Sequence, residues 1–175
     1  MEYQYYNQFI NKETKGRYDV TPIFENPEVF AHLLKDLIKP FNTTSFDKIA
    51  GIDALGFVIG GALAQNKKVG FICIRKGGKL PGMASQVLKS SSFSDYTSTQ
   101  KSLEINRASI KKGDKILLID EWIETGTQMK AAVSLIETLG GEVIGISSLC
   151  SHRNEKTEVL FEKYNLKALE VIDER

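Results

Sequence analysis

Two neighbouring carboxylates, Asp120 and Glu121, are the residues of this sequence that most directly suggest chemistry. They follow the unbroken apolar run from Ile116 to Ile119, which is typical of a parallel strand covered on both faces. The pair is therefore expected where that strand emerges, at the edge of the sheet where ligands of open α/β folds bind. Carboxylate oxygens there can accept hydrogen bonds from sugar hydroxyls or hold a hydrated Mg²⁺ ion.

A short polar loop follows the acidic pair and precedes a helical pattern, predicted from Gln128 to Leu139. A helix N-terminus offers unpaired N–H groups and the positive end of the helix dipole, so it can bind a phosphate. A ribose 5-phosphate would satisfy both the carboxylates and the loop. An ordinary strand-loop-helix unit without a ligand has the same pattern, because acidic residues favour the first turn of any helix. The loop residues are Glu124, Thr125, Gly126, Thr127 and Gln128.

A regular alternation of strands and helices must position these groups. It predicts an α/β fold with a parallel sheet flanked by helices and right-handed crossovers. Asp53, Arg75 and Asp120 then gather at the carboxyl ends of their strands. The segments 14–22 and after Cys150 lie outside the alternation and are expected to form a small hood. The predicted strands are 48–52, 70–74, 115–119 and 142–149, and the predicted helices are 27–38, 56–65 and 128–139.

Length and composition narrow the class of protein further. The 175 residues fit one domain, 1–175, and a net charge of +1 gives no sign of a nucleic-acid partner. The two cysteines, Cys73 and Cys150, suggest neither a disulfide framework nor a metal knuckle. No apolar run is long enough for a membrane span, and the polar N-terminus lacks a signal-peptide core. We therefore expect no membrane partner and a cytoplasmic location.

Two segments upstream of the acidic pair extend the pattern: 48–64, KIAGIDALGFVIGGALA, and 70–82, GFICIRKGGKLPG. With the acidic-pair segment they resemble the type I phosphoribosyltransferase family, and within it most closely the adenine phosphoribosyltransferases, from about residue 16 to 150. The resemblance implies transfer of a phosphoribosyl group from phosphoribosyl pyrophosphate (PRPP) to a nucleobase, with adenine favoured, in purine salvage. It also implies a homodimer, a flexible catalytic loop, and Mg²⁺ that arrives with PRPP rather than on protein ligands of its own.

The resemblance also assigns roles to individual residues. Asp120 and Glu121 would bind the ribose hydroxyls, and residues 124–128 would surround the 5-phosphate. The hood would cover the base, with Tyr18 and Val20 in the region whose backbone contacts adenine in relatives, although core packing or surface exposure would equally explain an aromatic there. A basic cluster after a strand would, by itself, be a solvated loop. Pyrophosphate would be bound by Asp53, Ala54, Leu55, Arg75, Lys76 and Lys79.

Three positions depart from the family pattern. Leu55 stands where adenine phosphoribosyltransferases carry an arginine that touches pyrophosphate. Residues 124–128 read Glu-Thr-Gly-Thr-Gln where relatives usually read Ala-Thr-Gly-Gly-Thr, so Glu124 is expected to point away from a bound phosphate and Thr127 to adopt the right-handed conformation of a helix start. In the serine-rich loop between Pro81 and Leu103, Thr97 replaces a glutamate implicated in proton transfer.

The same residues are compatible with several alternatives. The serine-rich loop is also compatible with a plain linker, and its proton donor or acceptor is unidentified, with Asp95, Glu104 and Tyr96 nearby. A regulatory protein that senses PRPP without turning it over would share the fold, although the balanced charge leaves little room for a nucleic-acid-binding element. A phosphoribosyltransferase for xanthine, guanine or a pyrimidine is the third hypothesis, because base choice depends on hood hydrogen bonds that residue types do not report.

Overall fold

The computed structural model describes residues 3–14, 18–94 and 100–174. In these residues the chain forms a seven-stranded sheet with the order β3-β6-β2-β1-β7-β8-β9. The strands from β2 to β9 in this order are parallel, whereas β6 and β3 pair antiparallel at one edge. The parallel strands are β1 (Lys48–Ile52), β2 (Gly70–Lys76), β7 (Lys115–Ile123), β8 (Glu142–Arg153) and β9 (Leu166–Asp173). The others are β3 (Val87–Lys89), β6 (Leu103–Asn106) and the separate hairpin of β4 (Phe93–Ser94) and β5 (Gln100–Lys101).

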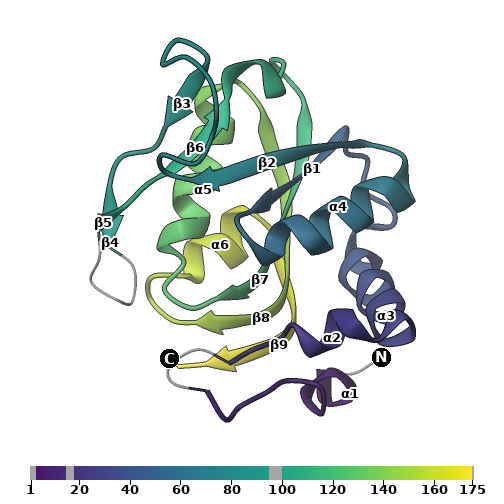
Figure 1. Cartoon of the computed structure of the whole chain (residues 1–175). Helices are drawn as coiled ribbons and strands as arrows, with labels where there is room; N and C mark the ends of the chain where they lie inside the picture. Colours follow the sequence, from purple (N-terminus) through teal and green to yellow (C-terminus); the bar gives the residue numbers. More distant parts are fainter. Residues whose placement is uncertain (1–2, 15–17, 95–99, 175) are drawn as a thin grey trace.

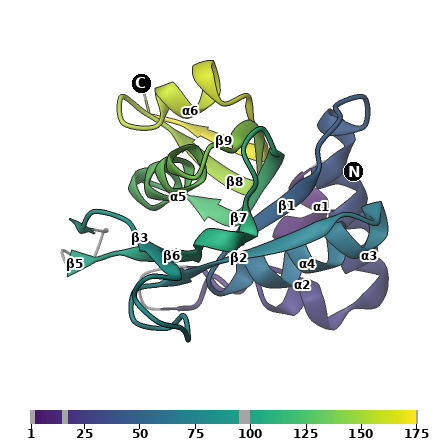
Figure 2. The same cartoon turned by 90° about the horizontal axis from the view of Figure 1, so that it is seen from above.

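Helices cover both faces of the sheet, as predicted for an α/β fold, with α3 and α4 on one face and α5 and α6 on the other (Figure 1, Figure 2). No helix in the described part of the chain has both the length and the apolar surface that a membrane crossing requires. The α-helices are α1 (Tyr3–Asn7), α2 (Pro22–Glu25), α3 (Pro27–Ile38), α4 (Leu55–Lys67), α5 (Thr127–Thr138) and α6 (Glu158–Lys163), and two short 3₁₀ helices span Lys39–Phe41 and Arg107–Ser109.

The central strand β7 divides its side chains between two hydrophobic cores. Ile116 and Leu118 belong to the core on the face of α5 and α6, whereas Leu117 and Ile119 belong to the core that includes residues of α3 and α4. Successive strand residues point to opposite faces, so one apolar run fills both cores. All four side chains are fully buried, and burying each contributes about 1.5–3 kcal/mol relative to exposure. This burial fixes the register of the strand that carries the acidic pair.

Local signals in the sequence define several element boundaries. Helix α3 has its predicted bounds, because Pro27 occupies its first turn and the Asn26 side chain accepts hydrogen bonds from the N–H groups of Glu28 and Val29 at 3.0 and 3.2 Å. Strand β1 also has its predicted bounds, whereas α4, β2 and β7 extend beyond theirs. Helix α5 begins at Thr127, which therefore has the expected right-handed conformation.

The segment after Cys150 differs from the prediction. It was expected to lie outside the strand-helix alternation, but β8 continues to Arg153, and α6 then leads into β9, which pairs parallel to β8. The alternation therefore continues to the end of the described chain, with β9 as an edge strand. The sequence pattern hides this unit because β9 has only exposed and half-buried residues after Leu166, so it lacks the apolar run of a central strand. Of the expected hood, this C-terminal part belongs to the sheet.

Candidate active site

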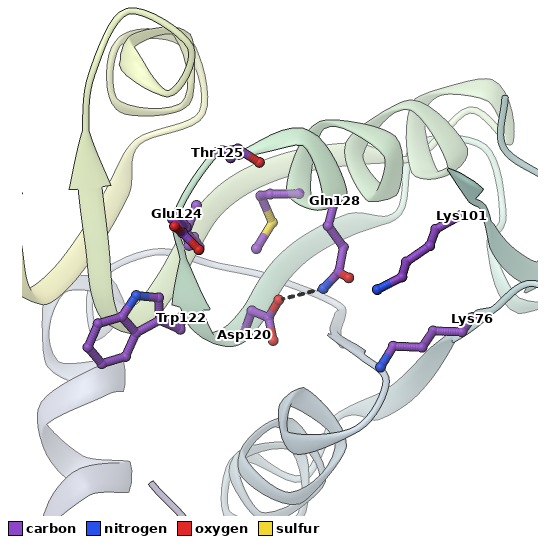
Figure 3. Close-up of a pocket in the computed structure, with 10 residues that line it drawn as sticks. Lys76, Lys101, Asp120, Trp122, Glu124, Thr125 and Gln128 are labelled. Atoms are coloured by element: carbon purple, nitrogen blue, oxygen red, sulfur yellow. Dashed lines mark hydrogen bonds between the residues drawn. The ribbon is translucent and has the colours of Figure 1, made fainter. Parts of the chain in front are cut away.

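The carboxyl ends of β1, β2 and β7 meet at one edge of the sheet, where they bring Asp53, Lys76 and Asp120 together around two adjoining cavities. Gln128 and Lys76 line both cavities, so they mark the junction between them. The first cavity has a volume of 110 Å³ and is lined by Lys76, Lys101, Asp120, Trp122, Ile123, Glu124, Thr125, Gly126, Gln128 and Met129 (Figure 3). The second has a volume of 280 Å³ and is lined by Tyr18, Asp19, Asp53, Ala54, Leu55, Lys76, Glu121 and Gln128.

The two carboxylates of the acidic pair point into different cavities. Asp120 lines the first cavity and Glu121 the second, because consecutive residues of β7 face opposite sides of the sheet. The pair lies within β7 rather than beyond its end, which corrects the predicted strand end at Ile119. Only 4% of Asp120 and 5% of Glu121 is exposed. Asp120 accepts hydrogen bonds from the Glu121 backbone N–H at 3.0 Å and from the Gln128 side-chain amide at 3.2 Å.

The turn from Asp53 to Gly56 packs closely against the acidic pair. A Cβ atom on Gly56 would lie 2.9 Å from the carbonyl oxygen of Ile119 and 3.3 Å from Oδ1 of Asp120. A Cβ atom on Gly51 would lie only 2.2 Å from the carbonyl oxygen of Gly56. Glycine at both positions therefore allows this backbone to approach β7, which places Asp53, Ala54 and Leu55 beside Glu121 in the second cavity.

The loop before α5 leads into the N-terminus of that helix. Helix α5 begins at Thr127 without a side-chain cap, and the first N–H groups of a helix have no carbonyl partner within the helix itself. The Thr125 hydroxyl donates to the Thr127 hydroxyl at 3.1 Å and lies 3.4 Å from the Thr127 backbone nitrogen. Glu124 is exposed but also lines the first cavity, so its expected orientation away from a bound phosphate stays a prediction. An anion in the first cavity would therefore meet N–H groups, the Thr125 hydroxyl and the positive end of the α5 dipole.

Gly126 fixes the shape of this loop in two ways. Its φ of +68° lies in the left-handed region that favours glycine. A Cβ atom there would also lie 3.0 Å from Cγ2 of Thr157 and 3.1 Å from Cδ1 of Leu160. Thr157 is fully buried, and its hydroxyl donates to the carbonyl oxygen of His152 at 2.7 Å and accepts from the Asn154 N–H at 2.9 Å. The loop is therefore supported from behind by the β8–α6 connection.

The predicted basic residues lie at different distances from the cavities. Lys76 reaches both of them. Arg75 lies beside the turn, with 3.6 Å between its Nε and Oδ2 of Asp53, and this buried Nε has no hydrogen-bond partner among the described residues. Lys79 is exposed in the following turn, outside the residues that line the two cavities. Sequence reasoning missed Lys101, which reaches the first cavity from β5; its serine-rich surroundings contain no pattern that predicts this position.

Glu104 organises the turn that follows Lys76. Its carboxylate accepts hydrogen bonds from the N–H of Gly78 at 2.8 Å and of Leu80 at 3.3 Å, and only 7% of the residue is exposed. The hydrogen bond from the Gly78 N–H is the main cause that lowers the pKa of Glu104. Leu80, Lys89 and Lys79 lower this pKa further, whereas burial of the carboxylate raises it. These contacts give Glu104 a structural role in positioning the basic turn. Asp95, Tyr96 and Thr97, the other residues named for the flexible loop, lie outside the described residues.

An aromatic ladder lies beside the second cavity. The Tyr18 ring contacts the Trp122 ring edge-to-face with 5.9 Å between centroids, and Trp122 contacts the His152 ring at 6.3 Å. Tyr18 is 44% exposed and lines the cavity together with Asp19, whose carboxylate accepts hydrogen bonds from the backbone and hydroxyl of Thr21. Val20 is only 2% exposed and points into the core, and it is not among the residues that line the second cavity.

Comparisons with known proteins agree with this geometry. Residues 19–174 match the family model described as a phosphoribosyl transferase domain. The chain is 39% identical over 127 residues to an adenine phosphoribosyltransferase of Cereibacter sphaeroides, which covers 73% of this chain and 68% of that protein. It is similar to the crystal structure of adenine phosphoribosyltransferase from Rhodothermus marinus, with a TM-score of 0.85, 28% identity and coverage of 97% and 98% of the two chains. The structure of the Giardia lamblia enzyme complexed with 9-deazaadenine gives a TM-score of 0.84 at 27% identity, with 98% of both chains covered.

Proposed function

We propose that this chain, which belongs to the phosphoribosyltransferase family, transfers the phosphoribosyl group of PRPP to adenine in purine salvage and releases pyrophosphate. The observation that carries this proposal is the pair of cavities that meet at Gln128 and Lys76. One contains a helix N-terminus suited to a phosphate, and the other contains the Asp53 turn and the aromatic side chain of Tyr18. The two carboxylates lie between them, where a ribose would connect the two ends of the substrate.

The 5-phosphate of PRPP binds in the first cavity, at residues 124–128. The Thr125 and Thr127 hydroxyls and the N–H groups at the start of α5 donate to the phosphate oxygens. Glu124 lines this cavity but is exposed, so its carboxylate can turn to solvent when the phosphate binds. This anchor fixes one end of the substrate, which orients the ribose C1 for reaction.

The ribose lies across β7, where Asp120 and Glu121 accept hydrogen bonds from its hydroxyls. When pyrophosphate leaves, C1 becomes oxocarbenium-like and carries developing positive charge. Two carboxylates that β7 and Gln128 already hold in place stabilise that charge without reorganising during the reaction. Their low exposure strengthens this interaction, because water screens it less than at the surface.

Pyrophosphate departs from the second cavity, at the turn of Asp53, Ala54 and Leu55. Lys76 and Arg75 stabilise its negative charge, and Lys79 adds to their field from the adjacent turn. Leu55 supplies no charge, so one charge-assisted hydrogen bond of about 1.5–3 kcal/mol is missing relative to family members with arginine there. The remaining cations preserve binding at reduced strength.

Mg²⁺ accompanies PRPP and neutralises part of its phosphate charge when bound. Among the described residues, no group of three or more His, Cys, Asp or Glu side chains is placed to hold a metal ion. Asp53 and the acidic pair offer carboxylate oxygens near the substrate, which suits a hydrated ion held chiefly by the substrate's own oxygens.

The nucleobase enters the second cavity beneath Tyr18. The bond from the base nitrogen to C1 forms as the bond from C1 to the pyrophosphate oxygen breaks, and the proton of that nitrogen passes to the departing pyrophosphate or to water. Tyr18 and the backbone at Val20 provide one wall of the base site, and the edge-to-face contact with Trp122 holds the Tyr18 ring in position. Backbone groups there set the choice of base.

The protein works as a cytoplasmic homodimer. Both Cys73 and Cys150 are free thiols in the structure, which agrees with a reducing compartment. Val58 on α4 is 41% exposed, an apolar side chain that a subunit interface would cover. Sedimentation equilibrium measures the assembly directly: a mass near twice 19.5 kDa supports the dimer, and a mass of one chain at micromolar concentration refutes it.

The decisive assay for the reaction is pyrophosphate release from PRPP and Mg²⁺ with adenine, guanine, xanthine or uracil in separate reactions. We expect the highest kcat/KM with adenine, together with formation of the matching nucleoside monophosphate. A higher kcat/KM with another base would reassign the substrate. PRPP binding without turnover of any base would instead identify a PRPP sensor, the function that the missing cation at Leu55 would suit.

A further inference from the structure

Lys101 lies across the first cavity from the phosphate loop. It is half-buried in β5, and its side chain lines the same cavity as Thr125, Gly126 and Gln128. Figure 3 shows the amino groups of Lys101 and Lys76 pointing from the same side toward the space in front of Gln128 and Asp120. Neither the resemblance to the family nor the pattern of the sequence assigns a role to Lys101.

The backbone around Lys101 holds it in this place. Its neighbour Ser102 is buried, and the Ser102 carbonyl oxygen accepts a hydrogen bond from the Gly77 N–H at 2.8 Å. A Cβ atom on Gly77 would lie 2.2 Å from the Ser102 hydroxyl oxygen, so the two segments are in close contact. On the other side, β5 pairs with β4, where Phe93 packs against the core that contains α5. Lys101 is therefore anchored at both ends, unlike a lysine on a solvated loop.

The charges around the first cavity distinguish Lys101 from the other lysine that lines it. The ionisable residues that line it are the acids Asp120 and Glu124 and the bases Lys76 and Lys101. Lys76 also lines the second cavity, so it is shared between both ends of the substrate. A phosphate monoester carries nearly two negative charges at neutral pH. The end of a helix supplies only about half a positive charge. Lys101 is the lysine in this lining that serves the first cavity without also serving the second.

We infer that Lys101 binds the 5-phosphate of the substrate, as a cation that β5 delivers to the phosphate loop. This assignment rests on the proposed function, because it deepens the role of the same site. Lys101 supplies a positive charge at the 5-phosphate end of the site. At the pyrophosphate end, Leu55 supplies none where relatives have an arginine. The affinity for PRPP then depends more on the 5-phosphate than it would with an arginine at position 55.

Binding of two substrate fragments separates the two ends of the site. Titration calorimetry measures ribose 5-phosphate and inorganic pyrophosphate separately, and Trp122, the single tryptophan, gives a second signal because it lines the first cavity. We expect Lys101→Gln to weaken ribose 5-phosphate about tenfold or more and to change pyrophosphate affinity by less than about twofold. Lys101→Arg keeps the charge and should stay within about threefold of wild type for both.

Lys112→Gln is the matched control, because it removes the same charge from an exposed position just before β7, at the opposite end of that strand from Asp120. We expect this control to bind both fragments as the wild type does. Circular dichroism checks the fold of each variant, and Lys101→Met, which keeps an aliphatic stem, replaces Lys101→Gln should the latter fail to fold. Activity gives an independent measure: loss of Lys101 should raise KM for PRPP while KM for the base stays unchanged.

Several results would overturn the assignment. They are unchanged ribose 5-phosphate affinity in the uncharged variants, equal weakening of both fragments, or no binding of ribose 5-phosphate to the wild type. These outcomes are distinguishable from failure of the proposed function. A wild-type protein that binds ribose 5-phosphate through Lys101 but turns over no base retains the Lys101 assignment and loses the enzymatic one. An active enzyme whose KM for PRPP does not change when Lys101 is replaced retains the enzymatic function and loses the Lys101 assignment.

Discussion

The side-chain amide of Gln128 donates a hydrogen bond to the carboxylate of Asp120, with 3.2 Å between Nε2 and Oδ2. The bond connects the first turn of α5 to β7, so the phosphate loop and the acidic pair form one unit. Gln128 also lies at the junction of the two cavities. A ligand that binds the loop therefore meets an acidic group whose orientation is already fixed.

Neutralising the acidic pair tests its role in sugar binding. We expect Asp120→Asn combined with Glu121→Gln to weaken PRPP about 100-fold, because two hydrogen bonds from sugar hydroxyls lose their charged acceptors. Calorimetric titration of PRPP with Mg²⁺ measures the change. Glu142→Gln, at the exposed start of β8, is the control and should bind PRPP normally. Wild-type affinity of the double variant for PRPP would show that the ribose does not bind at Asp120 and Glu121.

Gly126→Ala should harm both the loop and the fold. The substitution forces a side chain into a φ of +68° and places its Cβ 3.0 Å from Thr157. We expect a loss of about 1–2 kcal/mol in the free energy of unfolding, measured in urea, with weaker binding of ribose 5-phosphate. Gly61→Ala in α4 is the matched control, because its Cβ meets nothing within 4 Å and helix propensity favours alanine by about 1 kcal/mol. Equal stability of the two variants would contradict this description.

Glu104 should make stability depend on pH in the acidic range. Hydrogen bonds from Gly78 and Leu80 lower its pKa from the ordinary value of 4.5, so the folded protein binds this proton less tightly than the unfolded chain. The stabilisation is fully present above pH 4.5 and is lost as the pH falls through the folded pKa. Urea unfolding across this range should show a smaller acid-induced loss for Glu104→Gln than for wild type. Glu162→Gln, at an exposed position of α6, controls for the removed charge. If the free energy of unfolding falls with pH equally in Glu104→Gln and wild type, Glu104 does not cause the acid-induced loss.

Leu55→Arg should strengthen pyrophosphate binding. Leu55 lines the second cavity beside Asp53, so an arginine there adds a cation where the leaving group lies. We expect the Kd for pyrophosphate and the KM for PRPP to fall about three- to tenfold, while ribose 5-phosphate binds as before. Gln65→Arg, near the far end of α4, adds the same charge outside the site and should change neither constant. Unchanged pyrophosphate affinity in Leu55→Arg would show that this turn does not bind pyrophosphate.

The sequence predicts the centre of the sheet well because burial on both faces leaves a clear signal. The run from Ile116 to Ile119 could only be buried, and the acidic pair after it had to lie near the carboxyl end of that strand. The end of β7 was harder to predict, because Asp120 and Glu121 look like the end of an apolar strand although both are buried. Asp120 is covered by the close approach of Gly56, a contact between distant segments that no local pattern reports.

The parts of the site that the sequence did not predict depend on tertiary contacts. Lys101 reaches the cavity because Ser102 packs against Gly77, which a serine-rich loop does not reveal. Glu104 was a candidate for proton transfer until its hydrogen bonds to Gly78 and Leu80 gave it a structural role. The final unit of the sheet was missed because β9 is an edge strand with few buried residues.

A crystal structure of the protein with PRPP and Mg²⁺ tests the central claim most directly. We predict the 5-phosphate at residues 124–128, the ribose hydroxyls against Asp120 and Glu121, and the diphosphate at the turn of Asp53 with Lys76. Density for the ribosyl donor anywhere other than above residues 120 to 128 would contradict the account.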